Sequence, residues 1–284
     1  MQKNILVTGG ARTGTTWIGE TIASSPAVRY VYEPFNIRSK AANALKPPYQ
    51  YFYIHDDNAA KFRERVANIY RPTDWKTRAA RLVGYGTRTL QKDPAALFSS
   101  SWLASELDAK VIVMVRHPAA VVYSRLRMEW RVDFSHLLKQ EALMRDHLAA
   151  LEPEMRKRLS KPDLFEEAIL LWKVHFHFVD ACRHQHPDWL FVRHEDVCFD
   201  PVGQFTQMFE FLDLPFTRKT REIIQRSTSA EHPHEAPGKV QHCLKRESSK
   251  VPEIWKDRLS AEQIERIREQ VSEISDRFYK PDEW

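Results

Sequence analysis

The stretch that decides the fold is Ile5-Leu6-Val7-Thr8 followed by Gly9-Gly10-Ala11-Arg12-Thr13-Gly14-Thr15-Thr16-Trp17. Its first four residues form a short apolar run, which predicts a buried strand. The chain has only 8 glycines, and four of them fall between Gly9 and Gly19. Glycine lets a backbone turn sharply or approach a ligand closely. This region therefore predicts a strand, a glycine-rich turn and then a helix.

The turn has the spacing G-x-x-x-x-G-T-T of a phosphate-binding loop, with Thr15 where such loops carry a lysine. In such a loop, successive backbone N–H groups and the N-terminus of a helix surround an anion. Arg12 adds a forked cation, whereas the lysine that reaches the β- and γ-phosphates is missing. We therefore expect the loop to bind a phosphate-like group without hydrolysing a nucleoside triphosphate. The alternative is an ordinary glycine-rich turn.

Outward from this loop, apolar runs and helical periodicity alternate along the chain. Strands are predicted at 5–8, 28–32, 87–91, 111–115 and 190–193. Helices are predicted at 15–24, 59–70, 75–82, 95–107, 119–127, 134–150, 164–185, 201–212, 219–227 and 261–279. This alternation predicts an α/β fold of three layers, α/β/α, with a central parallel sheet. Ligands bind beyond the carboxyl ends of such strands, where we expect Glu33, Lys92 and Arg116.

Length and composition narrow the class of protein. The 284 residues are 43% hydrophobic and 29% charged, which is typical of a soluble globular chain and predicts a single domain over 1–284. Three cysteines without C-x-x-C spacing favour a reducing compartment, and no apolar run reaches the roughly 18 residues of a membrane span. The net charge of +5 suits an anionic ligand but not nucleic acid. We expect a cytoplasmic, bacterial protein without an integral membrane segment.

A second candidate anion site follows the predicted strand at 111–115. Arg116 lies at the end of that strand, and Ser124 lies eight residues further on, about two helical turns along. An arginine with a hydroxyl can bind a second phosphate. An arginine after a strand is more often solvated or salt-bridged. The pair therefore indicates a phosphate site only because it accompanies the first loop.

Together these residues resemble the PAPS-dependent sulfotransferases, whose donor is 3′-phosphoadenosine 5′-phosphosulfate (PAPS). Residues 12–17 are similar to the family's 5′-phosphosulfate loop, and the strand with Arg116 and Ser124 is similar to its 3′-phosphate motif. Arg193-His194-Glu195-Asp196, Asp200-Pro201 and Trp255-Lys256 resemble later segments of the family. Gaps in the resemblance at about 36–86 and 128–162 are interpreted as acceptor-side insertions. In the first gap, the aromatic run at 49–53 is either packing within a lid or a stacking wall for the acceptor.

The resemblance implies which residues hold the donor and its product, 3′,5′-bisphosphoadenosine (PAP). The 5′-phosphosulfate would lie against Arg12, Thr13, Gly14, Thr15, Thr16 and Trp17, and the 3′-phosphate against Arg116 and Ser124. Lys245 and Arg246 fall where family members close a loop over the nucleotide, although the family's Arg-Lys-Gly form is missing there. No metal is expected, because His175 and His177 stand two residues apart on a predicted helix and face different directions.

Sulfuryl transfer needs a base for the acceptor proton and a cation for the departing group. Glu33, just after the predicted strand 28–32, is our candidate base, and Lys92 with Arg12 is our candidate cation. Lys92-Asp93-Pro94 resembles the carbohydrate-type branch of the family, and the histidine that the aryl-type branch places two residues after the lysine is missing. The expected acceptor is a hydroxyl of a carbohydrate, glycolipid or small metabolite. Otherwise Glu33 caps a turn and Lys92 is a surface charge.

Two other functions stay open from the sequence. A P-loop nucleotide kinase or NTPase would need the missing lysine and a strand that ends in a Mg²⁺-binding carboxylate, whereas the strand 111–115 ends in Arg116. A non-catalytic PAP-binding protein would keep the fold, and substitution of Glu33 or Lys92 would leave its function unchanged. Binding of PAP without Mg²⁺ distinguishes the sulfotransferase from the kinase.

Overall fold

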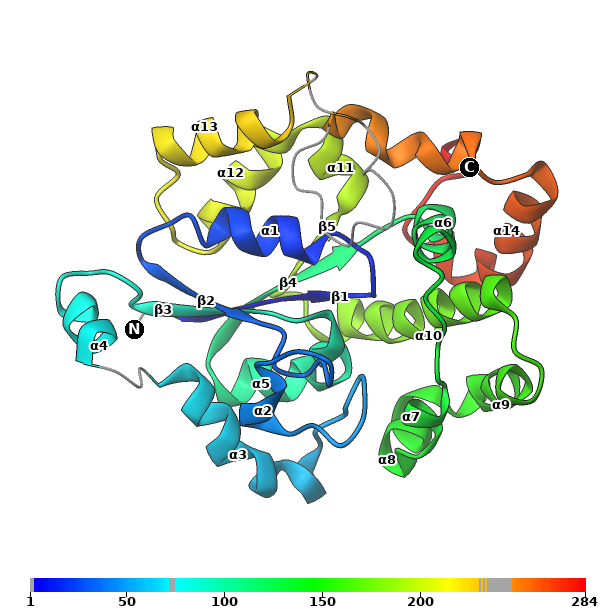
Figure 1. Ribbon diagram of the computed structural model, residues 1–284, viewed down its shortest axis with the longest axis horizontal. Coiled ribbons are helices and arrows are strands. Elements are labelled where there is room, and N and C mark those ends of the chain that lie inside the picture. The colour runs from blue at the N-terminus through cyan, green and yellow to red at the C-terminus, as the bar shows by residue number, and fades with distance from the viewer. Residues whose placement is uncertain (1–2, 72–74, 230, 232, 234–246) are drawn as a thin grey trace.

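The computed structural model describes residues 3–71, 75–229, 231, 233 and 247–284. Its centre is a sheet of five parallel strands, β1 (Asn4–Gly9), β2 (Val28–Tyr32), β3 (Arg88–Lys92), β4 (Ala109–Val115) and β5 (Leu190–Arg193). The strands lie in the order β2-β3-β1-β4-β5 (Figure 1). All the pairings are parallel, so the carboxyl ends of the strands meet at one edge of the sheet.

The central strand β1 is buried on both of its faces. Successive side chains of a strand point to opposite faces of the sheet. Leu6 belongs to one apolar cluster, whereas Ile5 and Val7 belong to a second cluster on the other side. All three side chains are fully buried. A continuous apolar run is expected of a parallel strand covered on both sides. Burial on both faces therefore explains why the apolar run at 5–8 predicted a strand.

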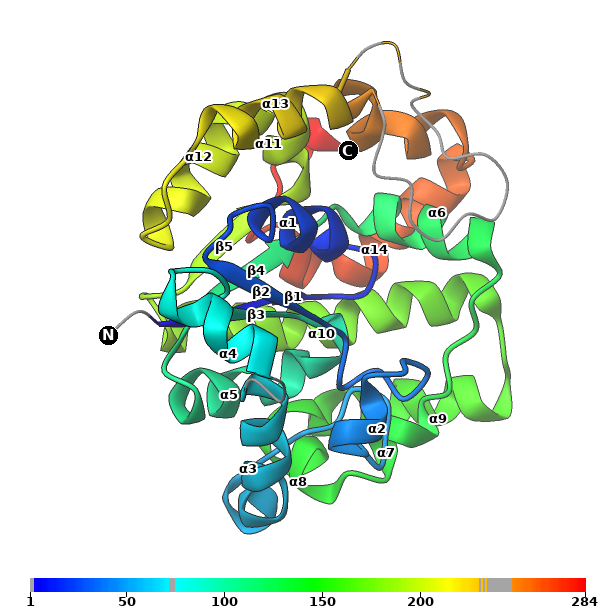
Figure 2. The same cartoon turned by 60° about the vertical axis from the view of Figure 1, so that its left-hand side comes forward.

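Helices cover both faces of the sheet (Figures 1 and 2). One face carries α1 (Thr15–Ile22), α12 (Pro201–Phe211) and α13 (Arg218–Ser227). The other face carries α5 (Ser100–Glu106), α6 (Pro118–Met128) and the long helix α10 (Leu164–Gln185). The predicted fold class, a three-layer α/β/α arrangement with a parallel sheet, is confirmed.

The remaining helical elements surround these layers. They are α2 (Ala42–Leu45), α3 (Asp56–Tyr70), α4 (Trp75–Leu82), α7 (Ser135–Leu138), α8 (Glu141–Leu143), α9 (Glu152–Ser160), α11 (His194–Phe199) and α14 (Ala261–Ser275). Short 3₁₀ segments occupy Pro94–Ser99, Ala149–Leu151, Ser248–Asp257 and Pro281–Glu283, and a π-helical turn occupies Met144–Leu148. Within the described ranges, none of the helices has both the length and the apolar composition needed to cross a bilayer.

The predicted continuous helix at 134–150 is wrong. The chain forms α7 and α8 instead, and between them the backbone of Gln140 leaves the helical region with φ −100° and ψ 83°. The Gln140 side chain accepts a hydrogen bond from the Tyr53 amide at 2.8 Å and donates one to the Tyr51 carbonyl oxygen at 3.2 Å. These contacts come from a segment far away in the sequence, so local periodicity could not predict the break.

Other helical segments were not predicted, among them two that follow β5. Helix α11 follows β5 without a break, and the 3₁₀ segment Ser248–Asp257 lies between the helices predicted at 219–227 and 261–279. These two segments pack against each other. Trp255 also stacks on the ring of His117 with centroids 4.7 Å apart. Both segments are therefore stabilised by tertiary packing more than by their own periodicity.

Candidate active site

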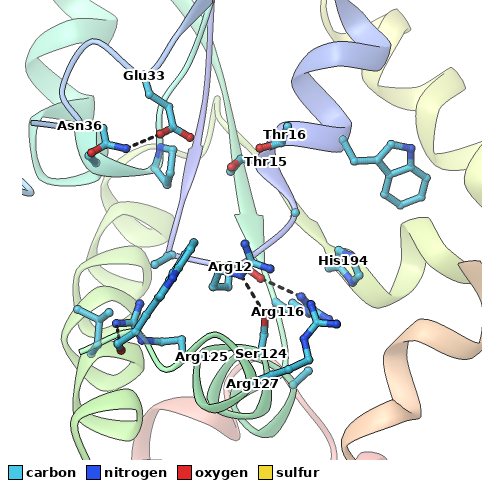
Figure 3. A pocket seen from close by; sticks show the side chains of 18 of the residues that line it. Arg12, Thr15, Thr16, Glu33, Asn36, Arg116, Ser124, Arg125, Arg127 and His194 are labelled. Atoms are coloured by element: carbon cyan, nitrogen blue, oxygen red, sulfur yellow. Dashed lines mark hydrogen bonds between the residues drawn. The ribbon is translucent and has the colours of Figure 1, made fainter. Parts of the chain in front are cut away.

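Residues at the carboxyl ends of four strands line one cavity of about 640 Å³. Arg12 belongs to the loop after β1, and Glu33, Arg116 and His194 directly follow β2, β4 and β5. Figure 3 shows these four side chains around the cavity, with Arg12 between Glu33 and His194. The cavity therefore lies at the edge of the sheet where a doubly covered parallel sheet binds its ligand.

The loop between β1 and α1 passes very close to its neighbours. Its backbone takes positive φ angles at Gly9 (145°), Arg12 (67°) and Gly14 (91°). A Cβ atom on Gly9 would lie 2.4 Å from the carbonyl oxygen of Met114, and one on Gly14 would lie 2.5 Å from the ring of His194. Glycine is required at both positions because any side chain would displace β4 or α11.

Hydrogen bonds hold this loop from behind. The Thr13 hydroxyl donates to the carbonyl oxygen of Gly10 at 2.8 Å, and the Ala11 N–H donates to Nδ1 of His175 at 3.3 Å. Thr13 is fully buried and is not part of the described lining of the cavity. The Thr13 side chain therefore lies inside the loop, where it maintains the shape of the loop. Its contact with the PAPS donor stays a prediction.

The next four residues of the motif face the cavity. Its lining includes Gly14, Thr15, Thr16 and Trp17. Helix α1 begins after Gly14, which has no side chain to cap the first N–H groups of the helix. Uncapped N–H groups and the positive end of the helix dipole favour an anion at this point. The arrangement can therefore hold a phosphate or sulfate group.

The two anion sites that the sequence predicted separately are in direct contact. Nε of Arg12 donates to Oγ of Ser124 at 3.0 Å, and Nη1 of Arg116 donates to the carbonyl oxygen of Arg12 at 3.0 Å (Figure 3). The Arg12 guanidinium also lies 5.1 Å from the centroid of the Trp130 ring. Arg127, which the sequence did not single out, lines the same part of the cavity. The result is one basic wall rather than two isolated sites.

Glu33 presents a nearly buried carboxylate to the cavity, with 5% of the residue exposed. Its Oε2 accepts a hydrogen bond from Nδ2 of Asn36 at 2.7 Å, and its Oε1 accepts one from Nζ of Lys92 in an ion pair. The Glu33 N–H donates to the carbonyl oxygen of Lys92 at 2.9 Å. Asp93 holds the next turn by accepting from the Phe35 amide at 2.6 Å. Each oxygen of the carboxylate therefore has a partner that fixes the group in position.

Lys92 lies behind the cavity wall. It is fully buried, and among the described residues it is not part of the cavity lining. Its ammonium group contacts Glu33 and stands 3.8 Å from the centroid of the Tyr32 ring. Burial lowers the pKa of Lys92, and the negative charge of Glu33 opposes that shift. The structure therefore places this predicted catalytic cation against Glu33 and away from the space that a ligand would occupy.

His194 is a cavity residue that sequence reasoning did not assign. It lies beside Trp17, with ring centroids 6.2 Å apart and an interplanar angle of 70°. Its Nδ1 lies 3.6 Å from Sγ of Cys198. The two rings form an aromatic part of the wall, which can contact a planar base. The signal that could have found His194 is its place directly after a strand, which Glu33 and Arg116 share.

The sequence profile described as the sulfotransferase domain matches residues 2–278. The chain belongs to this sulfotransferase domain family. Among curated protein sequences, none matches the chain. This membership favours the sulfotransferase over the nucleotide kinase that the sequence left open, and the family is enzymatic.

Solved structures agree with this family fold. The sulfotransferase domain from the curacin biosynthetic pathway is 15% identical, with a TM-score of 0.52 over 96% of this chain and 98% of that chain. The sulfotransferase domain of the Synechococcus PCC 7002 olefin synthase is 17% identical, with a TM-score of 0.52 over 98% and 97%. Retinol dehydratase, in complex with androsterone and the inactive cofactor PAP, is 15% identical, with a TM-score of 0.50 over 98% and 83%. At these identities the likeness shows the fold alone.

Some predicted features of this sulfotransferase lie outside the described residues. Lys245 and Arg246, expected in a loop over the nucleotide, are both in that part of the chain. Within the described part, no group of three or more His, Cys, Asp or Glu side chains is arranged to hold a metal ion.

The neutral form of His175 supports the glycine-rich loop between β1 and α1. The residue is 1% exposed, and its Nδ1 accepts the hydrogen bond from the Ala11 amide. The ring also packs edge-on against Tyr51, with centroids 4.7 Å apart. Burial lowers the pKa of His175 to about 3. The ring therefore lies within the core, with Nδ1 bonded to the loop and Nε2 without a hydrogen-bond partner among the described residues.

We expect the sulfotransferase to lose stability as the pH falls below 6.5, the ordinary pKa of histidine. In the unfolded chain His175 takes up a proton near that pH, whereas in the folded chain its pKa is about 3, so acid favours unfolding. Between pH 7.5 and 5.0 this amounts to about 2 kcal/mol. Urea unfolding at the two pH values measures it, with His175→Gln as the matched variant. An equal loss in both proteins would exclude His175 as the cause.

Proposed function

We propose that this sulfotransferase moves the sulfuryl group of PAPS to an acceptor hydroxyl, with Glu33 as the general base. One observation carries the proposal: a single cavity joins the uncapped N-terminus of α1 and a wall of arginines to a fixed, nearly buried carboxylate. Glu33 with Lys92-Asp93-Pro94 supports the carbohydrate-type branch, and thus a carbohydrate, glycolipid or small metabolite as the acceptor.

The residues of the cavity fit the groups of the donor. The backbone N–H groups at the start of α1 and Arg12 would hold the 5′-phosphosulfate, and Arg116 with Ser124 would hold the 3′-phosphate. Trp17 and His194, which lie side by side in the wall, would contact the adenine. Two adjacent sites, one with Arg12 and one with Arg116 and Ser124, are connected by the Arg12–Ser124 hydrogen bond and match a donor with two separate anionic groups.

Glu33 would act on the acceptor hydroxyl from the other end of the cavity. The hydroxyl oxygen forms a bond to sulfur while the bond from sulfur to the 5′-phosphate oxygen breaks, which releases PAP, and the hydroxyl proton passes to Glu33. Arg12 would stabilise the charge that develops on the departing oxygen. Lys92 contacts Glu33 and does not line the cavity. Its role in this proposal is therefore to position the Glu33 carboxylate.

Titration of the purified protein with PAP tests this function. We expect binding in the micromolar range, without any need for Mg²⁺ and with a much weaker response to AMP. Calorimetry measures the affinity, and a thermal shift reports it independently, because a ligand that binds only the folded state raises its stability. Failure to bind PAP, or a preference for Mg-ATP over PAP, would overturn the proposal in favour of a nucleotide kinase.

Arg116→Ala should weaken PAP by about 10- to 100-fold, since a charge-assisted contact to the 3′-phosphate is lost. Adenosine 5′-phosphosulfate, which lacks that phosphate, should bind the variant with nearly the wild-type affinity. Calorimetric titration of both nucleotides into both proteins checks the difference. An equal loss for the two nucleotides would mean that Arg116 supports the Arg12 carbonyl without contacting the 3′-phosphate.

A further inference from the structure

The part of the cavity near Glu33 contains more cationic side chains than the ion pairs there neutralise. Glu33 itself is neutralised by Lys92. Arg131 pairs with Glu167, with Nη2 2.6 Å from Oε1. Asp133 is largely exposed and accepts from the Ser135 amide at 2.9 Å, with Nε2 of His136 3.8 Å away. Arg125 and Arg38, which also line the cavity, take part in no ion pair within the described part of the chain.

Arg125 is the decisive residue because it is buried, with 4% exposed. Its Nη2 donates to the carbonyl oxygens of Trp130 at 2.8 Å and Arg131 at 3.4 Å. Its Nε is buried without a hydrogen-bond partner among the described residues. Figure 3 shows Arg125 on the same side of Arg12 as Glu33 and Asn36, opposite Arg127 and His194. The side chain therefore belongs to the acceptor end of the cavity.

No carboxylate of the described residues forms an ion pair with Arg125. Glu167 acts on it electrostatically, but both oxygens of that carboxylate are already used, Oε1 by Arg131 and Oε2 by the Val132 amide at 3.1 Å. Burial lowers the pKa of Arg125, and the positive charge of Arg38 lowers it further. Burying a guanidinium without a counterion destabilises a protein. An anion bound from the cavity side would remove that penalty.

Arg38 is exposed and lines the same cavity as Arg125. Arg38 and Arg125 both act electrostatically on the hydroxyl of Tyr51, as does Glu33. Tyr51 also lines the cavity and is held with φ 59°. The phenol therefore lies within electrostatic reach of the two cations and of the proposed base, and all four residues line the same cavity. An anion bound in this part of the cavity would be attracted by both guanidinium groups.

We propose that Arg125 and Arg38 form a subsite for an anionic group carried by the acceptor, a carboxylate or a phosphate. The substrate class is then an anionic hydroxyl compound, for example an acidic sugar or a phosphorylated metabolite, in preference to a neutral alcohol. This proposal rests on the proposed sulfotransferase function. It assigns Arg125 a role in acceptor specificity that is separate from the donor contacts of its neighbour Ser124.

Small anions test the subsite without knowledge of the natural acceptor. Inorganic phosphate and acetate are titrated by calorimetry into the protein saturated with PAP, which occupies the sites proposed for the two phosphate groups of the donor. We expect one equivalent of anion to bind, and the tighter of the two identifies a phosphate or a carboxylate subsite. Arg125→Gln should weaken this binding by about tenfold or more, with PAP affinity unchanged. Arg145→Gln, which removes an exposed charge outside this cavity, is the matched control and should bind as the wild type does.

The outcomes separate this inference from the function on which it rests. If the wild type binds PAP but neither anion, or if Arg125→Gln binds the anion as tightly as the wild type, the subsite is wrong and the sulfotransferase function stands. If the wild type does not bind PAP, the proposed function fails. If Arg125→Gln does not fold, the exposed Arg38→Gln variant decides, because an unchanged anion affinity there would overturn the proposal.

Discussion

Replacement of Glu33 by glutamine should lower kcat by about 10²- to 10⁴-fold, which is the usual contribution of a positioned general base. The amide keeps the shape of the carboxylate and can still accept a hydrogen bond from Asn36, but it cannot take up the acceptor proton. PAP affinity should stay unchanged, because a base acts on the transition state rather than on the bound donor. The rate is measured with PAPS and an acceptor found by screening, and the affinity by calorimetry.

The ion pair with Lys92 makes a control necessary. Breaking a buried ion pair destabilises a protein by about 3–5 kcal/mol, and Glu33→Gln breaks this one. Lys92→Met removes the same pair but keeps the carboxylate, so it should lose stability while retaining much more activity than Glu33→Gln. If Glu33→Gln keeps its full rate, Glu33 is not the base. If Lys92→Met is as inactive as Glu33→Gln at equal folded fraction, the loss in Glu33→Gln reflects the broken ion pair as well as the missing base.

Arg12→Ala should abolish measurable turnover and weaken PAP by about 100-fold or more, since a forked cation contact is lost. The contacts of Arg12 lead us to expect a larger loss of PAP affinity than the sequence alone would predict. The Arg12 side chain contacts Ser124, and its carbonyl oxygen accepts from Arg116. Loss of the guanidinium therefore affects the sites for both phosphate groups. Calorimetry with PAP and a rate assay with PAPS measure the two effects.

Two further substitutions separate the side chain of Arg12 from its backbone. Arg12 has φ 67°, a conformation that glycine takes without strain. Arg12→Gly should therefore lose as much PAP affinity as Arg12→Ala while it folds at least as well. Arg12→Lys keeps the charge without the fork, and it should recover part of the affinity. If the alanine variant binds PAP within twofold of the wild type, the proposed 5′-phosphosulfate contact of Arg12 is wrong.

The sequence predicted the sheet and the glycine-rich loop after β1 because both leave local signals. The fully buried residues Ile5, Leu6 and Val7 form an uninterrupted apolar run. Gly9 and Gly14 take backbone angles that favour glycine, so their clustering marked the turn. The helix at 134–150 failed because Gln140 is bound by the distant residues Tyr51 and Tyr53. A contact of that kind is invisible to periodicity.

The candidate site divides in the same way. The sequence by itself determined the α/β fold and the motifs that carry the family resemblance, and it pointed to Glu33 and Arg116 at strand ends. Only the tertiary structure decided which charges neutralise one another. It placed Lys92 against Glu33, brought Arg12 onto Ser124, and left the buried Arg125 without an ion-pair partner in the part of the chain that the structure describes. The physical reason is that burial and ion pairing depend on residues far apart in the chain, whereas strands and turns depend mainly on residues that are neighbours in the sequence.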